Sequence, residues 1–117
     1  MIEQRKNNRI HVTWRGLIKI SDDEVLDIKL VEIASSGMLF SCPVVLKASQ
    51  IYLILLTVPN LANPSKEPFK VPCKVKVLHS VLSGNSFRSG ANIIEIDHSH
   101  RELIDSWIAF ENKVRKN

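Results

Sequence analysis

The feature that most constrains the fold is a change in hydrophobic period at residue 98. Over residues 10–96, apolar and polar residues mostly alternate, in short segments separated by turn-forming residues. Such alternation is typical of β-strands that bury one face. From residue 98 onward, apolar residues recur at the three- and four-residue spacing of an amphipathic helix. The chain therefore predicts a mainly β, antiparallel structure followed by one α-helix.

The alternating region divides into six expected strands. They cover Ile10–Ile20, Val25–Ile33, Met38–Cys42, Ser49–Val58, Phe69–Leu82 and Phe87–Ile96. In the second strand, Glu32 is expected on the same face as Ile28 and Leu30. Pro72 in the fifth strand predicts an edge position or a bulge. Short strands joined in a meander close into a small barrel or sandwich.

The helical segment is expected to span residues 98–115. Ser99 and Glu102 form a Ser-x-x-Glu sequence, which is typical of a capping box at a helix start. We expect this helix to cover an open end or face of the β-structure through its apolar side, which consists of Leu103, Ile104, Trp107 and Ile108.

The composition fits one soluble domain. The chain has 117 residues, of which 44% are hydrophobic, and this is enough for a single core over residues 1–117. Cys42 and Cys73 are far apart in the sequence, and we expect buried free thiols. The aromatic residues expected in the core are Trp14, Phe40, Tyr52 and Trp107.

Nothing in the sequence predicts insertion into a membrane. The first nine residues are polar and lack the apolar core of a signal peptide. The longest apolar run, Ile51–Val58, is far shorter than the ~20 residues of a membrane-spanning helix. We therefore expect a cytoplasmic protein.

The residues that carry catalysis in enzymes form no recognisable pattern here. His98 and His100 are two residues apart, and this spacing does not bring two side chains to one face of a helix. The chain contains no Gly-x-Ser-x-Gly sequence and no Walker-type phosphate loop. These observations favour a binding domain over an enzyme, with no metal and no cofactor.

Two short clusters remain as candidates for a binding site. The first holds Arg5, Lys6 and Arg9, in a chain with a formal net charge of +4. Arginine grips phosphate through two parallel hydrogen bonds, and it can hydrogen-bond guanine or stack on a base. Four residues of extended chain span about 13 Å, so the two arginines can hold separate parts of a dinucleotide. A solubilising basic tail is the alternative interpretation.

The second cluster is residues 32–37, with the sequence Glu-Ile-Ala-Ser-Ser-Gly, at the end of a predicted strand. Its glycine permits a positive φ or a close approach of the backbone to a ligand. Its glutamate is able to accept hydrogen bonds from the N1–H and N2–H₂ donors of guanine. An ordinary β-turn is the alternative interpretation.

Taken together and in this order, the two clusters resemble the motifs of the PilZ domain family. That family places Arg-x-x-x-Arg just before the first barrel strand, and (Asp/Asn)-x-Ser-x-x-Gly further along, at a strand end. Arg5 and Arg9 match the first motif, and Gly37 matches the glycine of the second. Residues 87–94 resemble the late glycine-containing strand of that family, and the C-terminal helix resembles the helix that closes its barrel. The resemblance implies a six-stranded antiparallel β-barrel of the split-barrel type over residues 10–96, preceded by a flexible arginine loop at residues 1–9.

The resemblance also implies a function, which is a bacterial receptor for cyclic di-GMP that passes the signal to an unidentified partner protein. Glu32 stands where the family has Asp or Asn, and Ala34 stands where it has Ser. The glutamate shifts the carboxylate by one methylene, and the alanine lacks a hydroxyl whose hydrogen bond contributes about 0.5–1.5 kcal/mol. We therefore expect weakened rather than abolished binding. The implied ligand-binding residues are Arg5, Lys6, Arg9, Glu32, Ala34, Ser35 and Gly37.

Two other functions stay open. Glu32 and Ala34 favour a degenerate PilZ-type module, which would contact proteins of pilus, flagellar or polysaccharide machinery without binding the nucleotide. A basic barrel that binds single-stranded nucleic acid would need exposed aromatic side chains on which bases stack. Aromatic residues make up only 6% of this chain and mostly occupy expected core positions, so we expect no nucleic-acid polymer as partner. Both a monomer and a dimer are compatible with the sequence.

Overall fold

The structure, a computed structural model, describes residues 9–115. In this range the chain forms seven strands and then one helix. The elements are β1 (Arg9–His11), β2 (Arg15–Ser21), β3 (Glu24–Ala34), β4 (Gly37–Cys42), β5 (Ile51–Val58), β6 (Phe69–Ser83), β7 (Ser86–Ile96) and α1 (His98–Arg115).

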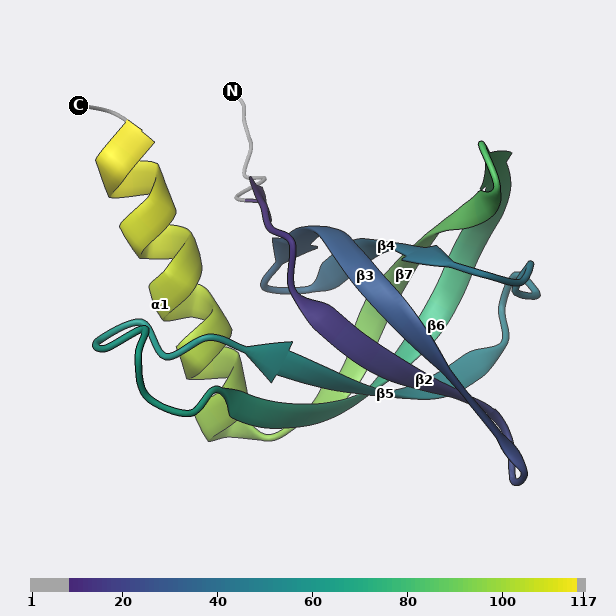
Figure 1. Ribbon diagram of the computed structural model, residues 1–117, viewed down its shortest axis with the longest axis horizontal. Coiled ribbons are helices and arrows are strands. Elements are labelled where there is room, and N and C mark those ends of the chain that lie inside the picture. Colours follow the sequence, from purple (N-terminus) through teal and green to yellow (C-terminus); the bar gives the residue numbers. More distant parts are fainter. Residues whose placement is uncertain (1–8, 116–117) are drawn as a thin grey trace.

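Strands β2–β7 close into an antiparallel barrel (Figure 1). The strand order is β1-β3-β2-β5-β6-β7-β4, and an additional pairing of β4 with β3 joins the sheet to itself. Closure gives each of these six strands a neighbour on both sides, which removes the open edges of a flat sheet. The predicted six-stranded barrel with a C-terminal helix is confirmed, and β1 is an additional short strand.

A β-bulge in β3 changes which residues face the core. The register with β4 shifts between Leu30 and Glu32, which leaves Val31 as an extra residue. Beyond it, Ile33 is fully buried and Glu32 turns outward. The expectation that Glu32 shares a face with Leu30 is wrong, because one inserted residue reverses the alternation of a strand.

The same bulge divides the first predicted strand. Residues 10–20 form β1 and β2, with a break at residues 12–14. In the break, Val12 N–H donates to the carbonyl of Val31 (3.1 Å), and Leu30 N–H donates to the carbonyl of Trp14 (2.8 Å). The chain therefore stays beside β3, but the regular ladder is lost opposite the bulge. β1 then lies along the second half of β3.

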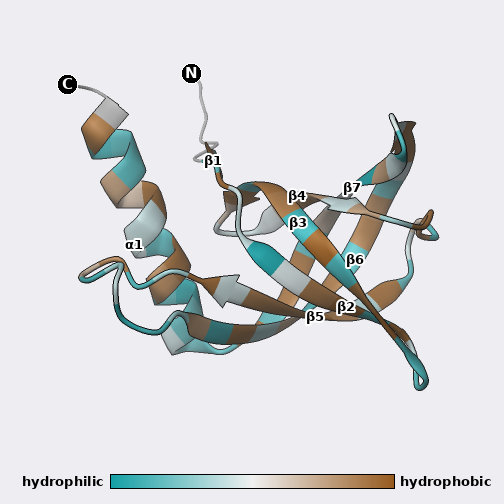
Figure 2. Ribbon diagram, in the orientation of Figure 1, coloured by the Kyte–Doolittle hydropathy of each residue, from teal (hydrophilic) through white to brown (hydrophobic). Residues whose placement is uncertain are grey.

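The barrel interior is one continuous hydrophobic core. Hydrophobic and hydrophilic residues alternate along the barrel strands, as Figure 2 shows clearly on β3. Trp14 and Phe40 are buried in this core, and Tyr52 and Trp107 pack against it partly buried. The predicted core positions of these four aromatic residues are confirmed.

Both cysteines are free thiols inside the barrel. Burial raises the pKa of the Cys42 thiol and raises that of the Cys73 thiol to about 11. Both groups are therefore uncharged at neutral pH and poorly reactive. The prediction of buried free thiols is confirmed.

Pro72 occupies a local edge of β6. It faces Leu55 of β5, whereas the pairing of β6 with β7 starts at the next residue, Cys73, opposite Ile96. Proline lacks an N–H donor, so it fits where the ladder has a neighbour on one side only. The predicted edge position is confirmed.

Helix α1 stands beside the barrel and packs against β1 and β3 (Figure 1). Ile104 and Ile108 are buried. The ring of Trp107 meets that of Trp14 edge-on at 5.7 Å between centroids, and its Nε1–H donates to the carbonyl of Pro59 (2.9 Å). Within residues 9–115, no helix has the length and apolar character needed to cross a membrane.

The helix is capped by Asp97 rather than by the predicted Ser99–Glu102 box. The Asp97 carbonyl accepts the N–H of Arg101 (3.0 Å), and its carboxylate accepts the hydroxyl of Ser99 (2.5 Å). This hydrogen bond with Ser99 lowers the pKa of Asp97. Glu102 pairs with His98 instead, at 3.4 Å between Oε2 and Nε2. The predicted box is wrong because a strong capping residue precedes the serine and takes the capping position.

Candidate ligand-binding site

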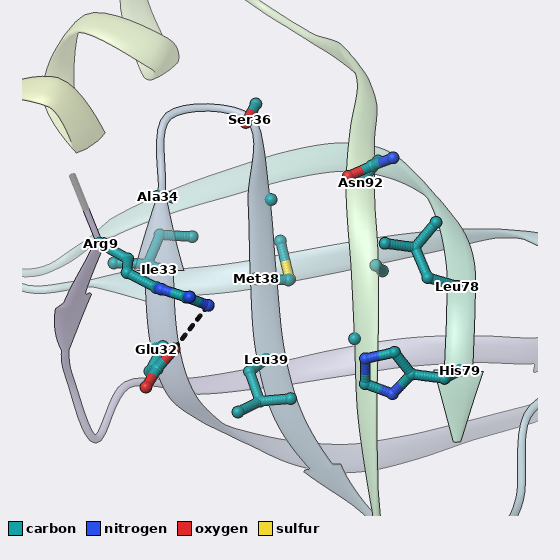
Figure 3. A pocket seen from close by; sticks show the side chains of 13 residues that line it. Arg9, Glu32, Ile33, Ala34, Ser36, Met38, Leu39, Leu78, His79 and Asn92 are labelled. Carbon is teal, nitrogen blue, oxygen red and sulfur yellow. Dashed lines mark hydrogen bonds and ion pairs between the residues drawn. The ribbon is translucent and has the colours of Figure 1, made fainter. Parts of the chain in front are cut away.

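A cleft of about 240 Å³ opens on the barrel surface, where β1, β3, β4, β6 and β7 meet (Figure 3). It brings β1 together with the β3–β4 turn and with residues of β6 and β7. Its lining consists of Arg9, Glu32, Ile33, Ala34, Ser36, Gly37, Met38, Leu39, Leu78, His79, Gly90, Ala91 and Asn92.

One wall of the cleft is an ion pair between β1 and β3. Arg9 Nη1 lies 3.4 Å from Glu32 Oε1, and His11 Nδ1 lies 3.7 Å from Glu32 Oε2. The register explains this grouping, because His11 faces Glu32 directly and Arg9 faces Ala34 on the same strand. The Arg9 side chain is 60% exposed, and Figure 3 shows it extending over the cleft. A guanidinium carries five N–H donors, so donors remain for a ligand beside the one directed at Glu32.

The β3–β4 turn closes one end of the cleft, and Gly37 is the residue that lets it lie so close to β7. A Cβ at this position would lie 2.9 Å from the carbonyl oxygen of Ala91. The only glycine with a positive φ in the described range is Gly84. Gly37 is therefore required here for close packing of two strands, and not for a left-handed conformation.

The turn is also fixed from two other directions. The carbonyl of Ser36 accepts the N–H of Ile93 in β7 (2.8 Å). The carbonyl of Ser35 accepts a hydrogen bond from the guanidinium of Arg101 in α1. The position of the turn is therefore coupled directly to both β7 and α1.

The opposite wall comes from β6 and β7, and sequence reasoning missed it. It consists of Leu78 and His79 from β6 with Gly90 and Asn92 from β7. A usable signal was present, because residues 83–86, with the sequence Ser-Gly-Asn-Ser, are typical of a hairpin turn between two strands. Counting back from the pair Ser83–Ser86 at that turn places His79 opposite Gly90, as in the structure.

The predicted ligand-binding residues that line the cleft are Arg9, Glu32, Ala34 and Gly37. Ser36 lines the cleft, whereas Ser35 does not and contributes its carbonyl to the contact with α1. Arg5 and Lys6 lie outside the described residues. The structure thus joins the second predicted cluster to one arginine of the first.

The side chains in the cleft are suited to holding an anionic nucleotide. Its lining includes a guanidinium, a carboxylate, an amide and an imidazole, together with two glycines that add no side chain to the cleft. Guanidinium groups bind phosphate, and the other three groups can hydrogen-bond a base. Among residues 9–115, no three His, Cys, Asp or Glu side chains come close enough to hold a metal ion together.

No protein-family model matches the chain, and no curated protein matches its sequence. Its structure is nevertheless similar to solved structures. The inhibitor of motility MotI/DgrA of Bacillus subtilis superposes with a TM-score of 0.84 at 9% identity, over 99% of this chain and 55% of that one. This chain thus spans about half the length of that protein.

Two structures of YcgR from Escherichia coli are also similar. The PilZ domain of YcgR with c-di-GMP superposes with a TM-score of 0.67 at 14% identity, over 97% of this chain and 96% of that domain. YcgR in complex with c-di-GMP gives a TM-score of 0.71 at 14% identity, over 98% of this chain and 49% of that one.

Proposed function

Because the chain has the fold of a PilZ domain, we propose that it binds cyclic di-GMP in the cleft and relays this binding to a partner protein. The observation that carries the proposal is the convergence of Arg9 and Gly37, which match the two family motifs, on a single cleft. Two solved structures of similar fold are complexes with this nucleotide. In this proposal the protein acts in the bacterial cytoplasm as a binding protein and not as an enzyme.

In the proposed complex, phosphate and guanine groups occupy different parts of the cleft. The guanidinium of Arg9 donates to phosphate oxygens or to the O6/N7 edge of a guanine. Arg5, four positions earlier in the sequence, supplies a second guanidinium, and Lys6 adds positive charge. The carboxylate of Glu32 accepts from the N1–H and N2–H₂ donors of a guanine.

Two residues reduce the expected affinity. Glu32 holds Arg9 at 3.4 Å, so the nucleotide has to compete with an internal ion pair. Ala34 lacks the hydroxyl of the family motif, which lowers affinity by up to about tenfold for one hydrogen bond. Ser36 lines the same cleft, and among the lining residues it carries the hydroxyl nearest in sequence to Ala34.

The proposed relay runs through the β3–β4 turn into helix α1. Ser35 and Ser36 belong to the turn, and Arg101 of α1 donates to the Ser35 carbonyl. A ligand that moves this turn therefore changes a contact made by the helix. We assign the partner no identity beyond a protein that contacts this helix or the neighbouring surface.

Titration calorimetry with cyclic di-GMP tests the proposal. Wild type is expected to show saturable binding. Arg9→Ala should weaken it at least tenfold, because a hydrogen bond to a charged group contributes about 1.5–3 kcal/mol. Arg5→Ala is expected to act in the same way. The matched control is Arg15→Ala, which removes an exposed arginine of β2 outside this cleft. The proposal is overturned if the folded protein shows no heat of binding and no change in melting temperature with cyclic di-GMP at high micromolar concentration.

A second candidate function is an interaction module of PilZ fold that no longer binds the nucleotide. The ion pair between Arg9 and Glu32 favours it, because the protein itself supplies a partner for the guanidinium. Such a module would contact proteins of pilus, flagellar or polysaccharide machinery. This candidate is supported over the first if the protein fails to bind cyclic di-GMP and recovers the same co-purifying proteins with and without the nucleotide.

A further inference from the structure

A second β-bulge lies on the far side of the cleft, in β6. In the pairing with β7, the register shifts between Val77 and His79, which leaves Leu78 as the extra residue. Up to Val77, alternate residues of β6 face the core. Leu78 and His79 are then both exposed, Leu78 by 52%. Bulges re-aim side chains beside binding sites, and this one directs two consecutive side chains into the cleft.

Hydrogen bonds behind the bulge hold it in place. Beyond the bulge Ser80 turns inward, and its Oγ accepts the N–H of Leu46 (3.1 Å) and the hydroxyl of Ser89 (2.9 Å). Ser89 is completely buried, and Ser80 is partly buried. The outward direction of His79 is therefore fixed by the packing of the next residue.

The ring of His79 lies against Gly90, the residue that faces it on β7. A Cβ at Gly90 would come within 2.5 Å of His79 Nε2 and 2.7 Å of Cε1. Only glycine leaves room for the ring in this position. Figure 3 shows the imidazole nearly face-on beside β7, with Leu78 close by on β6.

One row of residues crosses the cleft from wall to wall. Glu32 faces Leu39, and Leu39 faces Gly90. His79 faces Gly90 from the other side. Neighbouring strands lie about 4.8 Å apart, so Glu32 and His79 are about 14 Å apart when measured along the curved sheet. The imidazole of His79 covers Gly90 and stays exposed along the cleft, so a planar ring of a ligand can lie against it.

We propose that Leu78, His79 and Gly90 form a base platform, on which one nucleobase of the bound nucleotide stacks against the imidazole. This inference rests on the proposed function and assigns a ligand group to the wall that Arg9 does not reach. Arg9 and Glu32 hold phosphate and one guanine, and the base platform holds the other base. Stacking is tolerant of base identity, so the base platform contributes affinity and not base specificity. Recognition of guanine depends on Arg9 and Glu32 at the other wall.

Calorimetric titration of platform variants with cyclic di-GMP is the first test. His79→Ala is expected to weaken binding by about tenfold or more, as the loss of base–aromatic stacking does. His79→Phe keeps an aromatic face and is expected to stay within about threefold of wild type. Gly90→Ala displaces the ring without changing its chemistry and should act like His79→Ala. The matched control, His98→Ala, removes an exposed histidine at the start of α1 and should leave affinity unchanged.

A direct readout is the NMR signal of the His79 imidazole Cε1–H. Cyclic di-GMP is expected to shift this signal upfield through the ring current of the stacked base, whereas inorganic phosphate is not. If wild type binds but His79→Ala binds equally well, the platform is overturned and the proposed function stands. If His79→Phe binds as weakly as His79→Ala, the contact is polar, and the stacking platform is again overturned. A wild type that binds no cyclic di-GMP overturns both proposals.

Discussion

Arg9 and Glu32 lie on neighbouring strands with 3.4 Å between Nη1 and Oε1, inside the cleft proposed to hold the nucleotide. His11 contacts the other carboxylate oxygen at 3.7 Å. The carboxylate therefore takes a donor that a phosphate would otherwise use. Nucleotide binding at this wall requires an exchange of partners on Arg9, and the strength of the ion pair sets the cost of that exchange.

Shortening Glu32 should strengthen nucleotide binding. Glu32→Asp withdraws the carboxylate from Arg9 by one methylene and restores an acidic residue of the family motif. Because exposed ion pairs contribute about 0.2–1 kcal/mol, we expect a gain in affinity of up to about fivefold. Calorimetry with cyclic di-GMP at one fixed ionic strength measures the gain.

The second departure from the motif gives a matched comparison. Adding Ala34→Ser to Glu32→Asp should raise affinity further, by up to about tenfold, through one recovered hydrogen bond. The control is Ser35→Ala, which alters a neighbouring side chain that does not line the cleft. Weaker binding by Glu32→Asp would contradict the view that the Glu32 carboxylate competes for Arg9.

The close approach of β4 and β7 at Gly37 should not tolerate a side chain. Gly37→Ala places a Cβ 2.9 Å from the carbonyl oxygen of Ala91, and this atom belongs to the backbone and cannot move aside alone. We expect a loss of unfolding free energy of about 1–3 kcal/mol, as is typical of overpacking, together with weaker nucleotide binding. Urea denaturation measures the first effect. The control is Gly84→Asn, at a position with open space and a positive φ that asparagine tolerates. Equal stability of the two variants would count against a packing role for Gly37.

Arg101 should couple helix α1 to the turn that closes the cleft. Arg101→Ala removes the hydrogen bond to the Ser35 carbonyl, and we expect a loss of about 1 kcal/mol of unfolding free energy. Amide hydrogen exchange at residues 35–37 should become faster, because the turn keeps only its contact with β7. Arg88→Ala, which removes an exposed arginine of β7, is the control. Unchanged exchange at the turn in Arg101→Ala would remove the structural basis of the proposed relay.

The positions of the strands and the helix could be predicted because each depends on a local pattern. The alternation Val71, Cys73, Val75 and Val77 indicates one buried face whatever the strand pairs with, and all four residues are buried. The change to helical period at residue 98 is equally local, since it depends only on spacing within the segment. Such local patterns were sufficient to predict the fold class.

The contacts within the cleft could not be predicted in the same way, because they depend on registers between distant segments. The bulge at Val31 adds one residue to β3, and no compositional signal marks it. That residue turns Glu32 outward to Arg9, so the most consequential contact of the site depends on the least visible feature of the sequence. The Asp97 cap was missed for a different reason. The Ser99–Glu102 spacing fits a capping box, but Asp97, two residues before Ser99, is itself a strong capping residue and takes that position.

The negative charge on Asp97 should make helix stability depend on pH. The hydrogen bond from the Ser99 hydroxyl lowers the pKa of Asp97 below 3.8, its ordinary value. A carboxylate with a depressed pKa in the folded state stabilises that state fully above its unfolded pKa, and the contribution is lost as the pH falls through the folded pKa. Asp97→Asn keeps a good capping residue but removes the charge. Wild type should therefore melt at a higher temperature than Asp97→Asn near neutral pH, and the difference should vanish as the pH falls below about 4.

Thermal melts of both proteins across that range test this, with Asp105→Asn on the exposed side of α1 as control. A difference in melting temperature that is the same at every pH would show that the carboxylate charge at Asp97 has no part in it.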